Sequence, residues 1–203
     1  MLRVGLTGGI ATGKSTVGSM FGELGCPVLD SDQITHHLLE PGQAVYAAVV
    51  KEFGTRILAP DGTIDRATLG NIVFSEEPGR RSKLNELVHP AIMQRQQEWL
   101  KEREAADPNG VAIVSAALMI EVGTYKNYDR LVVVTCSPEV QKARLRIRSA
   151  LTDDQIEARI RSQMPMQEKV KFADFVIDNS ADLAATRKQV QDVHAKLREL
   201  AAK

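Results

Sequence analysis

The sequence predicts an α/β fold in which a five-stranded parallel sheet carries helices on both faces. Short apolar, β-branched runs alternate with helical patterns along the chain, and this alternation is typical of parallel sheets with right-handed crossovers. A glycine-rich stretch follows the first run and begins a helical pattern. The runs expected to be strands are 2–6, 27–29, 111–114, 131–135 and 175–177.

The composition excludes several classes of protein. The chain has 203 residues, of which 43% are hydrophobic and 26% charged, and this is ordinary for a globular protein that buries a core. Its 26 basic and 26 acidic residues leave no overall basic field of the kind that favours nucleic-acid or membrane binding. Cys26 and Cys136 form no C-x-x-C pair and are expected to be core thiols. We expect neither a signal peptide nor a membrane span, and therefore a cytoplasmic protein.

The glycine-rich stretch Gly8–Thr16 reads GGIATGKST and fits the phosphate-loop pattern G-x-x-x-x-G-K-[ST]. An apolar strand precedes it and an amphipathic helix follows, which disfavours a chance glycine turn before Lys-Ser. Its glycines let consecutive N–H groups turn toward a phosphate. Lys14 is expected to reach the β and γ phosphates and Ser15 to ligate Mg²⁺. The residues expected to bind the nucleotide here are Gly8, Gly9, Ala11, Thr12, Gly13, Lys14, Ser15 and Thr16.

Two carboxylates follow the second expected strand. Asp30 and Asp32 come at its carboxyl end, where open α/β sheets place their chemistry. Both acids, and Ser31 between them, also suit the N-cap of the helical pattern that follows. Because one acid can serve as the cap, we keep both roles and expect at least one acid to be catalytic or linked to a metal.

The stretch from Pro41 to Asp107 is helical and interrupted by turns, and it includes a helix expected to begin at Ala91. This is too much helix for a simple crossover between parallel strands. We therefore expect an inserted helical region, at about 33–107, that binds the second substrate. His89 is its candidate binding residue, and a helix cap or a packed surface histidine is the alternative.

A basic helical segment follows the fourth expected strand. Residues 137–139, Ser-Pro-Glu, are a strong helix start, and residues 152–155 read as a capping box. Each arginine alone suits a solvated face, but together beside a phosphate loop they favour a lid, at about 141–171, that closes on the transferring phosphate. The arginines are Arg144, Arg146, Arg148, Arg159 and Arg161.

The remaining segments make up the expected sheet core, which comprises residues 1–32, 108–140 and 172–203. Asp178 and Asn179 end the fifth expected strand. Apolar residues from Leu183 to Leu200 are spaced by threes and fours, which predicts a last helix that packs on the sheet. The chain is thus expected to be a single P-loop domain, dependent on ATP or GTP, with an insert and a lid.

Several stretches together resemble the dephospho-coenzyme A kinase family, whose members phosphorylate the ribose 3′-hydroxyl of dephospho-CoA in the last step of coenzyme A synthesis. The likeness spans nearly the whole chain, and its order and spacing make it specific. The stretches that carry it are Gly5–Ile10 with Gly13–Thr16, Asp30–Asp32, Pro41-Gly42, Phe53-Gly54, Asp61-Gly62, His89-Pro90, Ser137–Glu139, Ser162–Pro165 with Glu168-Lys169, and Ala173-Asp174 with Val176–Asn179.

The resemblance implies an ATP- and Mg²⁺-dependent enzyme with a sheet core, a helical CoA-binding insert and an arginine-bearing lid. Asp32 would orient the 3′-hydroxyl and accept its proton, and Asn179 would lie near the adenine end of ATP. The catalytic residues implied are Asp32, Lys14, Arg144 and Arg148. The residues implied to bind dephospho-CoA are Thr7, Asp32, His89, Leu118 and Glu121.

The chain departs from the family after the third strand. The family's Pro-Leu-Leu-Phe-Glu is replaced by residues 117–121, Ala-Leu-Met-Ile-Glu, and Ser115 stands where relatives often carry an acid. If that acid holds the water shell of Mg²⁺ in relatives, Ser115 would do so more weakly. Asp30 could compensate, acting through water.

Three other functions compete with this interpretation. Another P-loop nucleoside monophosphate or small-molecule kinase would share the lid and the insert. A regulatory GTPase switch is disfavoured because the chain has no Asn-Lys-x-Asp motif to read guanine, and residues 126–129, Lys-Asn-Tyr-Asp, have the wrong order. A non-catalytic nucleotide-binding module would leave Asp32 and the basic segment without a purpose.

Overall fold

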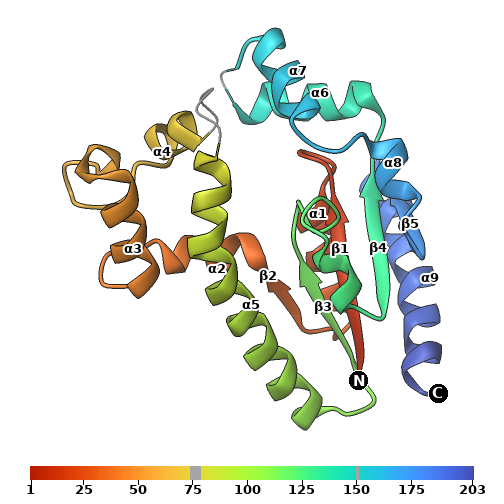
Figure 1. Cartoon of the computed structure of the whole chain (residues 1–203). Helices are drawn as coiled ribbons and strands as arrows, with labels where there is room; N and C mark the ends of the chain where they lie inside the picture. The colour runs from red at the N-terminus through yellow and green to blue at the C-terminus, as the bar shows by residue number, and fades with distance from the viewer. Residues whose placement is uncertain (74–78, 150) are drawn as a thin grey trace. The chain divides into compact units, whose positions relative to one another are not determined.

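A computed structural model of the chain describes residues 1–73, 79–149 and 151–203 (Figure 1). These residues form two compact units. The core unit comprises Met1–Asp30 and Leu100–Lys203, and the helical unit comprises Ser31–Trp99. No helix in these ranges combines the length and the apolar character that crossing a membrane requires.

The core unit is built on a five-stranded parallel sheet in the order β2-β3-β1-β4-β5, which confirms the predicted fold class. β1 lies at its centre, and Leu6 in β1 is in register with Ser115 on one side and Val132 on the other. Because all strands run the same way, their carboxyl ends meet at one edge. The strands are β1 Leu2–Gly8, β2 Val28–Asp30, β3 Val111–Ser115, β4 Arg130–Thr135 and β5 Phe175–Asp178.

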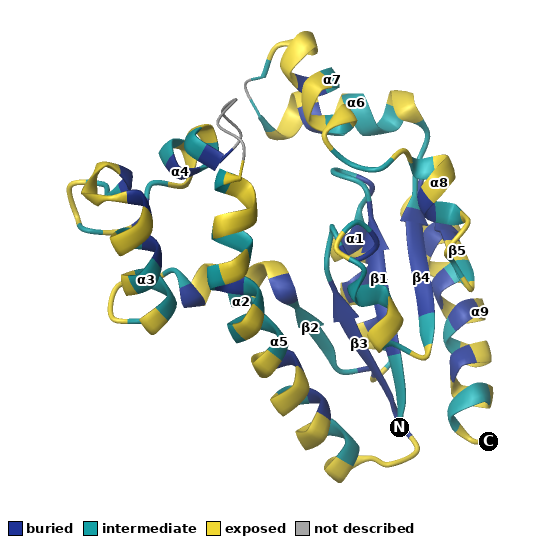
Figure 2. Ribbon diagram, viewed as in Figure 1, coloured by how far each residue is buried: buried dark blue, intermediate teal, exposed yellow. Residues whose placement is uncertain are grey.

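Both faces of the sheet are covered, as expected for parallel strands. On β4, Val132 and Val134 pack into the larger core cluster, which includes residues of α1 and α9, whereas Leu131 and Val133 pack into a second cluster on the other face. Figure 2 shows the buried residues concentrated in the sheet and on the helix faces turned toward it. The helices of the core unit are α1 Lys14–Glu23, η2 Thr124–Asn127, α6 Pro138–Arg148, α7 Asp153–Arg161, α8 Met166–Val170 and α9 Leu183–Ala201.

The helix ends follow the predicted signals. Ser137 caps α6, where its hydroxyl accepts a hydrogen bond from the Val140 N–H, and Thr152 forms a capping box with Gln155 at the start of α7. Gly25 follows α1 with φ 89°, the left-handed conformation expected of a glycine at this position. These caps fix where the basic segment begins and turns.

The helical unit has its own apolar core, which includes Val49, Phe53, Ile57 and Leu69. Its elements are α2 Ser31–Leu38, α3 Ala44–Phe53, η1 Thr55–Ile57, α4 Arg66–Val73 and the first part of α5, which spans Arg80–Ala106 and continues into the core unit.

The prediction that a helix begins at Ala91 is wrong, because α5 begins at Arg80 and runs through Pro90. Proline removes one backbone donor and disfavours a helix interior. Here Val88 is buried just before Pro90, and Ile92 packs against the same core cluster just after it. Apolar packing on both sides of the proline therefore outweighs its local cost.

Candidate functional site

The loop between β1 and α1 has the shape of an anion-binding turn. The Thr12 N–H and hydroxyl both donate to the Gly9 carbonyl, at 3.2 and 2.9 Å. Ala11 and Gly13 take positive φ values of 58° and 93°. The first helical bond, from the Val17 N–H to the Gly13 carbonyl, follows at once. The loop therefore leads directly into the amino end of α1, where unpaired N–H groups and the helix dipole favour a phosphate.

Asn179 braces this loop from the end of β5. Its buried side-chain amide donates to the Thr12 carbonyl at 2.8 Å and accepts from the Thr186 hydroxyl at 2.9 Å. The contact requires glycine at position 13, since a Cβ there would lie 1.9 Å from Asn179 Nδ2. The resemblance implies that Asn179 lies near adenine; the structure places its side chain against the phosphate loop.

Arg144 is the predicted lid arginine that the structure brings to the loop. Its guanidinium donates to the Thr12 carbonyl at 3.3 Å and to the Asn179 carbonyl at 2.9 Å. Arg146 instead pairs with Asp153, at 2.9 Å, and Arg148 is exposed. The remaining arginines of the segment, Arg159 and Arg161, are also exposed.

Lys14 is held where two strands end. Its ammonium donates to the Ser115 hydroxyl at 2.6 Å and lies 4.0 Å from the Asp30 carboxylate. Asp30 and Ser115 are register partners at the ends of β2 and β3, so both face the start of α1. From the sequence, Ser115 was expected only as a weaker substitute for an acid. The structure shows that it fixes the phosphate-loop lysine.

Ser15 and Asp30 offer donors that suit Mg²⁺. Ser15 is exposed in the first turn of α1, and the Asp30 side chain keeps 24% of its surface exposed. Both supply hard oxygen ligands, which Mg²⁺ prefers. The described residues contain no group of three His, Cys, Asp or Glu side chains that could hold a metal by itself. This donor set therefore fits an ion held mainly by substrate phosphates and water.

A buried ion pair holds the segment after β3. Lys169 of α8 is fully buried, and its ammonium lies 2.8 Å from Glu121 Oε1 and donates to the Ala117 carbonyl at 3.0 Å. The Thr7 hydroxyl donates to the same carbonyl at 3.2 Å. Glu121 Oε2 is buried and has no hydrogen-bond partner among the described residues. Two residues predicted to bind substrate, Glu121 and the half-buried Leu118, thus lie in this held segment, and a third, Thr7 of β1, is hydrogen-bonded to it.

Asp32 and His89 lie in the helical unit. Asp32 is exposed in the first turn of α2, and His89 is half-buried in α5, one residue before Pro90. Beside Asp32, the buried Ser31 hydroxyl accepts a hydrogen bond of 2.7 Å from Gln96. This bond fixes the start of α2. The roles of Asp32 and His89 toward a substrate stay predictions.

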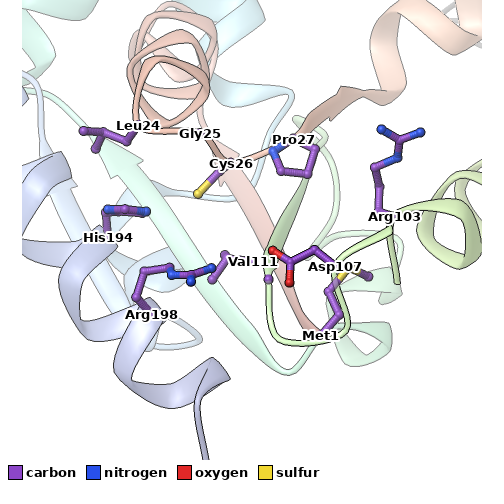
Figure 3. A pocket seen from close by; sticks show the side chains of 11 residues that line it. Met1, Leu24, Gly25, Cys26, Pro27, Arg103, Asp107, Val111, His194 and Arg198 are labelled. Atoms are coloured by element: carbon purple, nitrogen blue, oxygen red, sulfur yellow. The ribbon is translucent and has the colours of Figure 1, made fainter. Parts of the chain in front are cut away.

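A cavity of about 290 Å³ lies at the other end of the sheet, where β1 and β3 begin (Figure 3). Arg103 and Arg198 line it near the carboxyl ends of α5 and α9, where cations complement the negative ends of helix dipoles. Burial raises the pKa of the Cys26 thiol to about 11, although the Arg198 charge opposes this. Burial and Arg198 together lower the pKa of His194. A protonated thiol is a poor nucleophile, so Cys26 is not a candidate catalytic residue.

A phosphate loop at the carboxyl edge of a parallel sheet, with its lysine fixed by the neighbouring strand ends, defines a nucleotide-binding protein of the P-loop kinase class. A family model described as Dephospho-CoA kinase matches residues 2–185. The chain belongs to the dephospho-CoA kinase family.

Individual proteins are similar to this chain over nearly its whole length. A dephospho-CoA kinase of Aquifex aeolicus is 46% identical over 197 residues, which cover 97% of this chain and 98% of the relative. Among solved structures, TT1252 from Thermus thermophilus is 30% identical with a TM-score of 0.81, and 97% of each chain is covered. Dephospho-CoA kinase from Campylobacter jejuni is 28% identical with a TM-score of 0.71, again over 97% of each chain.

Proposed function

We propose that this chain transfers the γ-phosphate of ATP to the ribose 3′-hydroxyl of dephospho-CoA, which gives coenzyme A and ADP. The observation that carries the proposal is Lys14, fixed between Ser115 and Asp30 beside a preformed phosphate loop, in a chain of the dephospho-CoA kinase family. Another nucleoside monophosphate or small-molecule kinase is not favoured, because the family match covers residues 2–185.

The donor phosphates would bind at the loop. Its N–H groups and the Lys14 ammonium would take the β and γ phosphates. Arg144, which is hydrogen-bonded to the Thr12 carbonyl, would add positive charge as the phosphoryl group moves. Mg²⁺, when bound, neutralises negative charge on the phosphates. Ser15 and, through water, Asp30 would hold it.

The acceptor would be positioned by Asp32. The bond that forms joins the 3′-oxygen to the γ-phosphorus, the bond that breaks joins that phosphorus to the oxygen retained by ADP, and the hydroxyl proton goes to the Asp32 carboxylate. Because the transition state is loose, orientation of the hydroxyl by Asp32 contributes at least as much as its basicity.

The rest of the chain would surround these groups. We propose that the helical region at about 33–107 binds the CoA moiety, with His89 in contact with it, and that Thr7, Leu118 and Glu121 line the acceptor side of the core unit. The compact unit at Ser31–Trp99 supports an insert of about this extent. We also propose that the segment at about 141–171 closes as a lid, and that the protein acts in the cytoplasm, for which its two free thiols are suited.

A coupled assay for ADP release tests this function. Wild type and Asp32→Asn are incubated with Mg²⁺-ATP and, in turn, dephospho-CoA, AMP, shikimate or no acceptor. Of the four conditions, we expect ADP release only in the one that contains dephospho-CoA. For Asp32→Asn we expect kcat to fall 10²- to 10⁴-fold while the affinity for ATP is unchanged. Glu52→Gln, which removes an exposed carboxylate of the same unit, is the matched control and should retain wild-type rates. Equal ADP release without dephospho-CoA would contradict the proposal.

A further inference from the structure

Two glutamine side chains hold both polar groups of Ile10 at the tip of the phosphate loop. Gln163, which follows α7, accepts a hydrogen bond of 2.8 Å from the Ile10 N–H. Gln141, in α6, donates its amide to the Ile10 carbonyl at 2.7 Å. An N–H only donates and a carbonyl only accepts, so the orientation of both side-chain amides is fixed. We call this pair the glutamine brace.

The brace is itself held in place on both sides. The Met164 N–H, next to Gln163, donates to Glu121 Oε1 at 3.2 Å, and that carboxylate is paired with the buried Lys169. Gln141 also packs closely on Gly9, where an added Cβ would lie 3.2 Å from its amide nitrogen. The contacts are therefore built into the packing of the core unit.

The residue after Ile10 is under backbone strain. Ala11 has φ 58° and is the sole non-glycine residue with positive φ in the ranges that the structure describes. An L residue disfavours this conformation by roughly a factor of ten, whereas glycine adopts it about as readily as the right-handed one. Ala11 lies between the braced Ile10 carbonyl and Thr12, whose N–H is bonded to Gly9.

We propose that Gln141 and Gln163 are positioning residues, which hold Ala11 in its left-handed conformation so that the phosphate loop has its anion-binding shape before the nucleotide arrives. The inference rests on the proposed function, because it assumes that the loop binds ATP. It assigns the two glutamines a role in nucleotide affinity without contact with the nucleotide.

The strain gives a quantitative expectation. Without the brace, only about one loop in ten keeps Ala11 left-handed, so the apparent Kd for ATP rises about tenfold. If position 11 is glycine, about half of the unbraced loops keep the shape, and the Kd rises only about twofold. The glutamines and residue 11 should therefore be coupled by a factor of about five.

The test is a double-mutant cycle on ATP binding by titration calorimetry, without dephospho-CoA. Gln141→Ala/Gln163→Ala is measured with Ala11 and in the Ala11→Gly background. We expect a rise in Kd of about tenfold in the first case and about twofold in the second. Gln167→Ala/Gln191→Ala, which removes two exposed glutamines, is the matched control and should leave the Kd unchanged.

Isosteric single variants keep the test valid if the double variant does not fold. Gln163→Glu retains an acceptor for the Ile10 N–H, whereas Gln141→Glu loses the donor to the Ile10 carbonyl. Gln141→Glu should therefore weaken ATP binding more than Gln163→Glu does, and Ala11→Gly should reduce that loss. An equal rise in Kd in both backgrounds, or no rise, overturns the inference. A wild type that does not bind ATP instead contradicts the proposed function.

Discussion

Replacing Gly13 by alanine should destabilise the core unit far more than the strain of a left-handed alanine would do by itself. The new Cβ would lie 1.9 Å from Asn179 Nδ2, so the amide must move and give up its buried bonds to Thr12 and Thr186. The left-handed conformation costs an alanine about 1 kcal/mol. The amide nitrogen and oxygen of Asn179, two buried polar groups left without these partners, cost about 3 kcal/mol more. We therefore expect the free energy of unfolding to fall by about 4 kcal/mol.

Gly25→Ala is the matched control. Gly25 has a similar φ of 89°, but a Cβ there would meet no atom within 4 Å. It should cost about 1 kcal/mol, so urea unfolding followed by circular dichroism should show a midpoint shift about four times smaller than that of Gly13→Ala. Equal losses in the two variants would refute the assignment of Asn179 as a brace of the loop.

Three further predictions concern other parts of the core unit. Lys169→Met leaves the Glu121 carboxylate without its buried cation and should lower the free energy of unfolding by about 3 kcal/mol. Lys169→Met/Glu121→Gln should recover part of this stability. Thermal melts that show no loss of stability for the single variant would contradict this prediction. Burial raises the pKa of Cys26 to about 11 in the folded protein, so the thiol of the unfolded chain loses its proton first as pH rises. The free energy of unfolding should therefore fall by roughly 2 kcal/mol between pH 9 and pH 11. Cys26→Ala should lack this part of the fall. Asp30→Asn should raise the Mg²⁺ concentration for half-maximal rate about tenfold, and an unchanged Mg²⁺ dependence would exclude Asp30 from the metal site.

The fold could be predicted from the sequence because its signals are local. Each strand of the parallel sheet is a short apolar run bounded by turns, and the expected runs differ from the observed strands by no more than two residues at either end. The phosphate-loop motif and the caps at Ser137 and Thr152 can be recognised from neighbouring residues alone. Pro90 misled the prediction, because the packing that carries α5 through it is tertiary.

Much of the site could not be predicted in this way, because its partners lie far apart along the chain. The bonds from Lys14 to Ser115 and from Ile10 to Gln163 span 101 and 153 positions. Gln141 and Lys169 occupy helices whose polar residues look like a solvated face, yet one braces the loop and the other is fully buried. For Gln163 and Lys169 the single available signal was their place in the stretches shared with the family.

The central position of β1 has a consequence for how the protein is made. In the sheet that the described residues form, β1 pairs with β3 and β4. The strand that carries the phosphate loop therefore has no neighbouring strand until about 100 further residues have been made, which takes roughly 5 to 20 s of synthesis. Ser31–Trp99 is complete by then and forms one continuous compact unit. The order of assembly thus runs against the order of the sequence: the inserted unit can fold on the ribosome first, and the nucleotide site, which begins near residue 8, is finished among the last parts, when Asn179 emerges.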